Sequence, residues 1–289
     1  MSYAEKACLR RSKYGMVNDM NCVRISLLFV FMAVTAGATP QQDAAFLRVW
    51  NAHAAEGADH MKVVAVCQSV MDKASTLGEW LPAVKTIAAW HLLAAGKESD
   101  AVRVFESAVT KETSTKPVAR FADIMARRWL SRIDAQSVSK ALRKYYAAHV
   151  AYPSSLAPVL NAKLPPPAKD RFGDAWVYRL ETFSRIQGLE SQKFALFSST
   201  IGKESMPLKP TLRKGYAPGY AATLISVKAL NNTQMAEFEA TSPGNAAQKG
   251  LTNEGGRAVN GVRLIKVGSD KRFALMIDVG DFWIMARPK

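Results

Sequence analysis

His53 and His60 lie seven residues apart, and the carboxylates of Glu56 and Asp59 lie between them. Imidazole and carboxylate groups are ligands that zinc and other divalent metals accept, so this cluster raises the question of a metal site. A metal would need a third strong ligand at a fixed spacing, and Gly57 is expected to break a helix between the two histidines. We therefore predict neither a metal nor another cofactor.

Ser137 and Lys140 satisfy S-x-x-K, a spacing that brings a lysine amine one helical turn from a serine hydroxyl. Enzymes that use this pair on penicillin-like substrates also carry S-D-N and K-T-G elements, and neither occurs in this sequence. The sequence also lacks G-x-S-x-G, H-E-x-x-H, G-x-G-x-x-G and Walker loops. We predict a protein that is not an enzyme, with a cell-wall-acting serine enzyme as an alternative.

Aromatic residues, prolines and turn-forming residues follow one another in a fixed order after Tyr152. The order is Tyr152-Pro153, then Leu164-Pro165-Pro166-Pro167, then Asp170-Arg171-Phe172-Gly173-Asp174-Ala175-Trp176-Val177-Tyr178. The Asp170 side chain can accept local N–H groups, and Gly173 can take the positive φ of a tight turn. Trp176 and Tyr178 are expected to be core residues rather than a platform for a ligand.

A helix ending in Tyr-Pro, a proline-rich crossing and a D-x-F-G-x-x-W-x-Y hairpin resemble the C-terminal part of the major pseudopilin of type II secretion systems and of its type IV pilin relatives. The resemblance covers about residues 135–202. It implies a helix packed across a short antiparallel sheet, in a protein of envelope assembly machinery. The residues that define this module are Tyr152, Pro153, Asp170, Phe172, Gly173, Trp176 and Tyr178.

The chain departs from the pseudopilin pattern in two respects. It has no Gly-Phe-Thr-Leu-x-Glu processing motif followed by a long apolar helix, so it is not expected to polymerise as a pilus subunit. Many major pseudopilins bind calcium in a later acidic loop, but residues 199–204 lack the several oxygen ligands that calcium needs. Both departures suit an accessory protein that contacts the machinery.

Residues 1–38 have the features of a secretory signal peptide. Arg24 precedes an apolar run, and Ala36 and Ala38 flank Gly37 as an A-x-A cleavage sequence. The run is shorter than the roughly 20 residues that a membrane-spanning helix needs. We expect cleavage and export to the periplasm or cell envelope, with an uncleaved inner-membrane anchor as the alternative.

The mature chain is expected to be shorter than the full sequence for a second reason. Met16 and Met20 offer later starts, so residues 1–15 need not be translated. Removal of the leader leaves Cys67 as the single cysteine, which excludes an intramolecular disulfide and a cysteine metal cluster. Cys67 lies on an apolar helical face, where a cysteine is expected to be a buried small hydrophobe.

The formal net charge of +15 indicates an anionic partner or a solvated basic surface. Nucleic acid is the usual partner of a basic chain. Export argues against nucleic acid, as does the scatter of Lys and Arg without interleaved aromatic residues. We expect envelope protein partners, including secretion or pilus components, or an anionic membrane surface or cell-wall polymer.

Residues 41–134 follow a helical pattern of apolar residues. Gly96 is placed to end one helix, and Ser99 is placed to cap the next. The stretch from Leu92 to Phe105 resembles the turn between the helices of tetratricopeptide repeats. A repeat array needs about three repeats, so a bundle of helical hairpins stays open as the other interpretation.

Two further helices are expected after Pro117, over residues 118–130 and 135–150, with Asp134 as the cap of the second. From residue 217 the pattern changes to short strands, expected at 221–230, 233–240, 261–267, 272–277 and 282–288. Short strands at this spacing predict a small antiparallel barrel or sandwich. The segment looks like the small periplasmic β-domains of secretion and pilus alignment proteins.

These features predict an α+β fold in three parts: an all-helical tetratricopeptide-like domain at 41–134, a pseudopilin-like module at 135–205 and a β-domain at 217–289. We expect an exported, non-enzymatic interaction or scaffold protein of the bacterial cell envelope, accessory to type II secretion or pilus-like assembly. A generic periplasmic helical-repeat adaptor is the alternative in which the module is merely structural.

Overall fold

The computed structural model describes residues 38–110, 114–184, 190–230 and 233–289. Helices combine with small antiparallel sheets, so the predicted α+β class is confirmed. Of the predicted signal peptide, Ala38 is described, and the remainder, including Ala36, lies outside the described residues. Ala38 is half-buried against the helical core.

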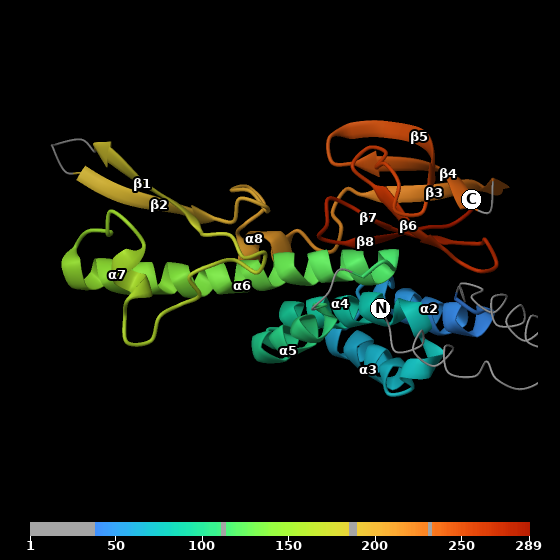
Figure 1. The fold of residues 1–289 in the computed structure, drawn as a ribbon, viewed down its shortest axis with the longest axis horizontal. Coiled ribbons are helices and arrows are strands. Elements are labelled where there is room, and N and C mark those ends of the chain that lie inside the picture. Colours follow the sequence, from blue (N-terminus) through green and yellow to red (C-terminus); the bar gives the residue numbers. More distant parts are fainter. Residues whose placement is uncertain (1–37, 111–113, 185–189, 231–232) are drawn as a thin grey trace, which may run out of the picture. The chain divides into compact units, whose positions relative to one another are not determined.

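Before residue 110, each helix contacts the next one in the chain (Figure 1). The helices are α2 (Pro40–His53), α3 (His60–Met71), α4 (Leu81–Ala94) and α5 (Glu98–Ala108), with the short 3-10 helices η3 (Ala74–Thr76) and η4 (Gly78–Trp80) between α3 and α4. Thr39 begins α2 with a capping box, because its hydroxyl accepts the Gln42 N–H while the Gln42 side chain accepts the Thr39 N–H at 2.9 Å.

The turn between α4 and α5 is a Schellman motif. Gly96 has a φ of +76°, and the Lys97 N–H donates to the Leu92 carbonyl at 2.8 Å. The predicted stop at Gly96 is therefore confirmed. The predicted cap at Ser99 is wrong. Lys97 occupies the N-cap position and α5 begins at Glu98, so Ser99 lies inside the first turn of the helix.

Helix α6 runs without a break from Pro117 to His149, so the predicted division into two helices at Asp134 is wrong. No glycine or proline lies between residues 118 and 149 to interrupt it. Asp134 does not cap a helix, because its Oδ1 accepts from Arg171 Nη2 at 3.2 Å. The boundary expected at 134/135 falls inside this helix. None of the described helices combines the length and apolar character of a membrane-crossing segment.

The distal half of α6, residues 135–149, lies beside an antiparallel hairpin (Figure 1). The hairpin consists of β1 (Val177–Ser184) and β2 (Glu190–Phe197), and the short helices α7 (Ala157–Leu160) and α8 (Leu208–Arg213) precede and follow it. Side chains from α6 and from the segments around the hairpin form one buried group, the distal cluster: Ala135, Val138, Leu142, Val159, Trp176, Ile201 and Met206.

Two three-stranded antiparallel sheets follow. The first contains β3 (Ala221–Leu230), β4 (Thr233–Ser242) and β5 (Asn245–Asn253), and the second contains β6 (Arg263–Val267), β7 (Ala274–Ile277) and β8 (Trp283–Ala286). Their facing sides share a buried cluster that includes Leu224 and Phe238 from one sheet and Leu264 and Met276 from the other. The sequence analysis missed β5, in which polar and apolar residues do not alternate and nearly all side chains are exposed.

The other side of the second sheet packs on the helices. Ile265, Leu275 and Trp283 belong to the same hydrophobic core as the buried residues of α2 to α5 and the first half of α6. Trp283 is fully buried, and its Nε1 donates to Thr86 Oγ1 of α4 at 2.7 Å. The helices at the start of the described chain and the strands at its end therefore bury one another.

Cys67 of α3 is a free, fully buried thiol. Burial raises its pKa to about 12. The thiol is therefore protonated and unreactive at neutral pH, which confirms that Cys67 acts as a small core residue.

Candidate functional site

The Asp170 carboxylate organises the D-x-F-G turn. Oδ1 accepts the N–H groups of Phe172 and Asp174 at 2.9 and 3.0 Å, and Oδ2 accepts the Ser198 hydroxyl at 2.5 Å. Gly173 has a φ of +94°, a conformation that glycine adopts without the strain that a Cβ would cause. The buried Asp170 side chain thus joins the turn to the end of β2.

The two aromatic residues that follow the turn bond to the chain before it, one to the proline-rich crossing and one to the Tyr-Pro step. Trp176 Nε1 donates to the Pro167 carbonyl at 2.8 Å, and the Tyr178 hydroxyl donates to the Pro153 carbonyl at 2.7 Å. Proline has no backbone N–H group, so a proline residue can form a backbone hydrogen bond only through its carbonyl. Trp176 is buried in the distal cluster, and partial burial raises the pKa of Tyr178.

Tyr152 and Phe172 complete the set of residues that define the module. The Tyr152 ring lies 4.9 Å from the Phe194 ring of β2, and its N–H donates to the Gln192 side chain at 2.9 Å. Phe172 is partly buried against the distal cluster. The residues singled out between 152 and 178 therefore contribute to one structure, in which contacts join the Tyr-Pro step, the proline-rich crossing, the D-x-F-G turn and the hairpin.

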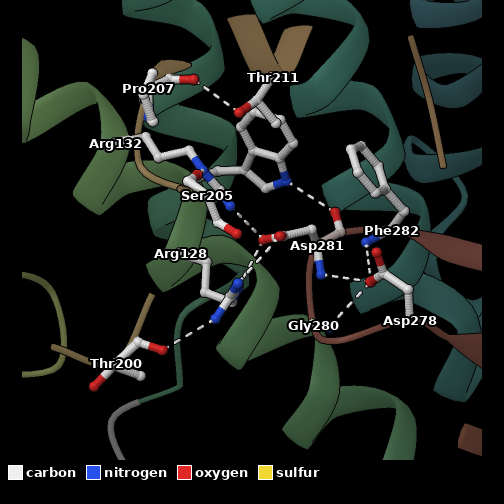
Figure 2. A network of polar contacts seen from close by, with 11 residues as sticks. Arg128, Arg132, Thr200, Ser205, Pro207, Thr211, Asp278, Gly280, Asp281 and Phe282 are labelled. Atoms are coloured by element: carbon white, nitrogen blue, oxygen red, sulfur yellow. Dashed lines mark hydrogen bonds and ion pairs between the residues drawn. The ribbon is translucent and has the colours of Figure 1, made fainter. Parts of the chain in front are cut away.

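Two arginines of α6 converge on one carboxylate in the loop between β7 and β8 (Figure 2). Arg128 donates from Nε to Asp281 Oδ1 at 2.7 Å and from Nη2 to Oδ2 at 3.1 Å. Arg132 Nη2 lies 2.8 Å from the same Oδ1, and Trp129 Nε1 donates to the Asp281 carbonyl at 3.0 Å. All four residues are buried. Each carboxylate oxygen accepts a hydrogen bond from Arg128, and the charge of Arg132 lies beside Oδ1, so the carboxylate clamps α6 to the β7–β8 loop.

The same arginines also reach the segment between β2 and α8. Arg128 Nη1 donates to the Thr200 carbonyl at 3.4 Å, and Arg132 Nε donates to the Ser205 carbonyl at 2.8 Å (Figure 2). The network therefore ties three segments together at the point where α6 leaves the helical core and enters the distal cluster.

A second carboxylate shapes the β7–β8 loop. Asp278 Oδ1 accepts the N–H groups of Gly280, Asp281 and Phe282 at 3.0, 2.7 and 2.9 Å. Burial and the charge of Asp281 raise the pKa of Asp278 to about 6 despite these bonds. Burial alone would also raise the pKa of Asp281, but the two arginines hold it below its ordinary value.

Three histidine rings form a row between α2, α3 and α4. His53 Nδ1 lies 2.8 Å from His91 Nε2, and His60 Nδ1 lies 2.9 Å from His91 Nδ1. His91 uses its two nitrogens on opposite neighbours, so in its neutral form one nitrogen donates and the other accepts. The nitrogens do not converge on one point. Within the described ranges, no group of three or more His, Cys, Asp or Glu is arranged to hold a metal ion.

Burial keeps two rings of this row, those of His53 and His91, neutral. It lowers the pKa of His53 to about 4, and burial together with the neighbouring histidines lowers the pKa of His91 to about 3. Tyr216 packs edge-on against His53 with ring centroids 4.1 Å apart. The sequence analysis paired His53 with His60 and missed His91. His91 lies in α4, which is buried around most of its circumference, and a polar residue in such a helix needs a partner.

Ser137 and Lys140 both have exposed side chains on α6. Within the described part of the chain, no hydrogen bond joins them. For the serine-enzyme alternative to gain support, a β-lactam probe would have to label the protein and Ser137→Ala would have to abolish that labelling.

The Arg–Asp network was not foreseen from the sequence. Arg128 and Arg132 continue the apolar stripe that Phe121 and Met125 form along α6, and a charge within such a stripe indicates a buried ion that needs a partner. The partner, Asp281, lies 153 residues from Arg128 and carries no local signal.

Neither a protein-family model, nor a curated protein sequence, nor a solved structure matches this chain. The resemblance to pseudopilins therefore depends on the residues quoted in the sequence analysis alone.

Proposed function

We propose that the chain is a non-enzymatic interaction protein of the bacterial cell envelope, accessory to type II secretion or to pilus-like assembly. The observation that carries the proposal is the packing of the distal half of α6 against the β1–β2 hairpin. A helix across a short antiparallel sheet is the arrangement that the pseudopilin resemblance implies.

Two details of that packing support the proposal. Trp176 donates to the Pro167 carbonyl of the proline-rich crossing, and Tyr178 donates to the Pro153 carbonyl of the Tyr-Pro step before it, so both residues serve the geometry of the module. Asp170 and Gly173 form the turn itself. The motif therefore acts as one structural unit, as the resemblance implies.

The geometry also suits a protein that presents surfaces rather than performs chemistry. The buried carboxylates of Asp170 and Asp281 are each satisfied by hydrogen-bond donors. Both hold segments of the chain in place. In this proposal the partner contacts the exposed side of the hairpin, which is held on α6 at a distance from the helical core.

A helical-repeat adaptor is the second candidate, and the α4–α5 hairpin favours it. The Schellman turn at Gly96 lets the two helices of this hairpin approach closely, and the fully buried Phe105 fills the space between them, as in tetratricopeptide repeats. In this case the partner would bind the helices before residue 110, and the β1–β2 hairpin would be structural.

Site-specific photo-crosslinking distinguishes these two candidates. A photoreactive residue replaces the exposed Arg179 on β1 in one variant and the exposed Arg103 on α5 in the matched control. We expect the Arg179 position to crosslink to a secretion or pilus component in envelope extracts, and the Arg103 position not to do so. Crosslinks at Arg103 alone would favour the adaptor.

Point variants are preferable to truncation in this experiment. A chain cut after residue 134 would end inside α6 and would remove Trp283 from the helical core. Loss of binding in such a fragment would then report unfolding. If neither crosslinking nor a pull-down with the full chain recovers a secretion or pilus component, the proposed function is wrong.

A further inference from the structure

The segment from the middle of α6 to the D-x-F-G turn carries charged side chains of one sign, which is positive. No aspartate or glutamate lies between Asp134 and Asp170. The same stretch carries five exposed cations, at Lys140, Arg143, Lys144, Lys163 and Lys169. Within the described ranges, none of the five is in an ion pair. This part of the surface is therefore basic and uncompensated.

Three of these cations share one face of α6. Lys140, Arg143 and Lys144 are spaced i, i+3 and i+4, so they project on the same side of the helix. Val138 and Leu142 lie on the opposite side, fully buried in the distal cluster. Lys140 and Lys144 repel one another at this spacing, and an anionic surface would relieve that repulsion.

The same segment of the chain also carries exposed apolar side chains. Val150 at the end of α6 is 80% exposed, and Leu164 in the proline-rich crossing is 90% exposed. Tyr146, one turn before Val150, is 38% exposed. Lysine and arginine beside exposed aliphatic and aromatic residues is the composition of elements that lie in a membrane interface, where the cations meet phosphate and the apolar tips enter the acyl boundary.

We propose that the basic face, defined as the side of α6 that carries Lys140, Arg143 and Lys144, docks on an anionic phospholipid bilayer, with the exposed Val150 and Leu164 of the same segment as apolar contacts. An acidic protein would be recognised through aromatic and arginine anchors in well-packed pockets. The basic face offers mainly lysines on flexible stems, and the same segment adds two isolated apolar tips, which suit a fluid surface of distributed negative charge. The inference does not depend on the proposed function, because bilayer binding requires no partner protein.

Vesicle flotation of the full chain tests this proposal. The vesicles contain phosphatidylglycerol and phosphatidylcholine, or phosphatidylcholine alone. Each cation near an anionic bilayer contributes about a fivefold gain in affinity, so K140Q/R143Q/K144Q should weaken binding to the anionic vesicles by about 100-fold. The matched control K62Q/K73Q/K97Q removes the same charge from exposed positions around α3 and before α5 and should keep the wild-type affinity.

A second variant tests the apolar contribution. V150S/L164S keeps every charge and alters only exposed side chains, so it should fold normally and bind the anionic vesicles more weakly than the wild type. Equal losses in the two charge variants would overturn the proposal, because general electrostatic attraction would then explain the binding. Equal binding to neutral and anionic vesicles, or no binding to either, would overturn it as well.

Discussion

Replacing Asp281 by asparagine should destabilise the protein strongly, because it removes the counter-charge of two buried arginines. Arg128 is 7% exposed and Arg132 is fully buried, and both pair with the Asp281 carboxylate. Asparagine has nearly the same size and keeps the backbone carbonyl that accepts from Trp129. The variant therefore changes charge with little change in packing.

The magnitude follows from this geometry. Removing one partner of a buried ion pair costs about 3–5 kcal/mol, because the remaining charge stays desolvated without compensation. Asp278 is the other carboxylate nearby, and its Oδ1 is occupied by three backbone N–H groups. A loss of this size is a large share of the roughly 5–15 kcal/mol by which a typical domain is stable. It should lower the melting temperature by on the order of 10 °C.

Urea unfolding followed by tryptophan fluorescence and circular dichroism measures this loss. Asp270→Asn is the matched control, because Asp270 is exposed and accepts only a local N–H, from Arg272. The triple variant R128M/R132M/D281L removes all three charges and should be more stable than D281N. The reasoning fails if D281N costs less than about 1 kcal/mol, a typical effect of any substitution. It also fails if the triple variant is less stable than D281N.

Three further predictions concern single side chains. Lowering the pH from 8 to 5 should reduce the free energy of unfolding by about 2 kcal/mol through His53. Its pKa is about 4 in the folded protein and 6.5 in the unfolded chain, so at pH 5 the unfolded chain binds the proton and the folded protein does not. Urea titrations at both pH values should show that His53→Asn loses this part of the pH dependence, and an unchanged dependence would contradict the account. Tyr178→Phe removes the hydrogen bond to the Pro153 carbonyl and should cost about 1 kcal/mol in the same titration, whereas no measurable cost would mean that the bond does not stabilise the crossing. Asp170→Ala leaves the N–H groups of the turn without their acceptor and should cost about 1–3 kcal/mol, with Asp170→Asn between it and the wild type; equal stability of all three proteins would refute the assigned role of the carboxylate.

The features that the sequence predicted well depend on short-range chemistry. Gly96 ends α4 because glycine takes the left-handed conformation that the turn needs. The D-x-F-G turn has Asp170 and Gly173 where the turn chemistry requires them. The strands from residue 221 onward were recognisable from alternating apolar residues between turn signals, apart from β5. That strand exists because β4 offers it a pairing edge, since its own residues favour no particular structure.

The error at Asp134 has a similar cause. An aspartate before an apolar run is a reasonable helix cap, but the same carboxylate can serve a distant arginine. Arg171 reaches Asp134 from the D-x-F-G turn, 37 residues later in the chain. The local pattern could not show which of these two roles the fold would use.

By itself, the sequence determined the turns, the helix stop at Gly96 and the strand pattern after residue 221, because each depends on interactions within a few residues. Only the tertiary structure decided that His91 joins His53 to His60 and that Asp281 neutralises Arg128 and Arg132. The physical reason is that a buried polar group requires a partner but does not specify where in the chain that partner lies. The packing of the helices against the sheets determines the partner, because it buries Arg128 and Asp281, which are 153 residues apart in the chain, at the same place.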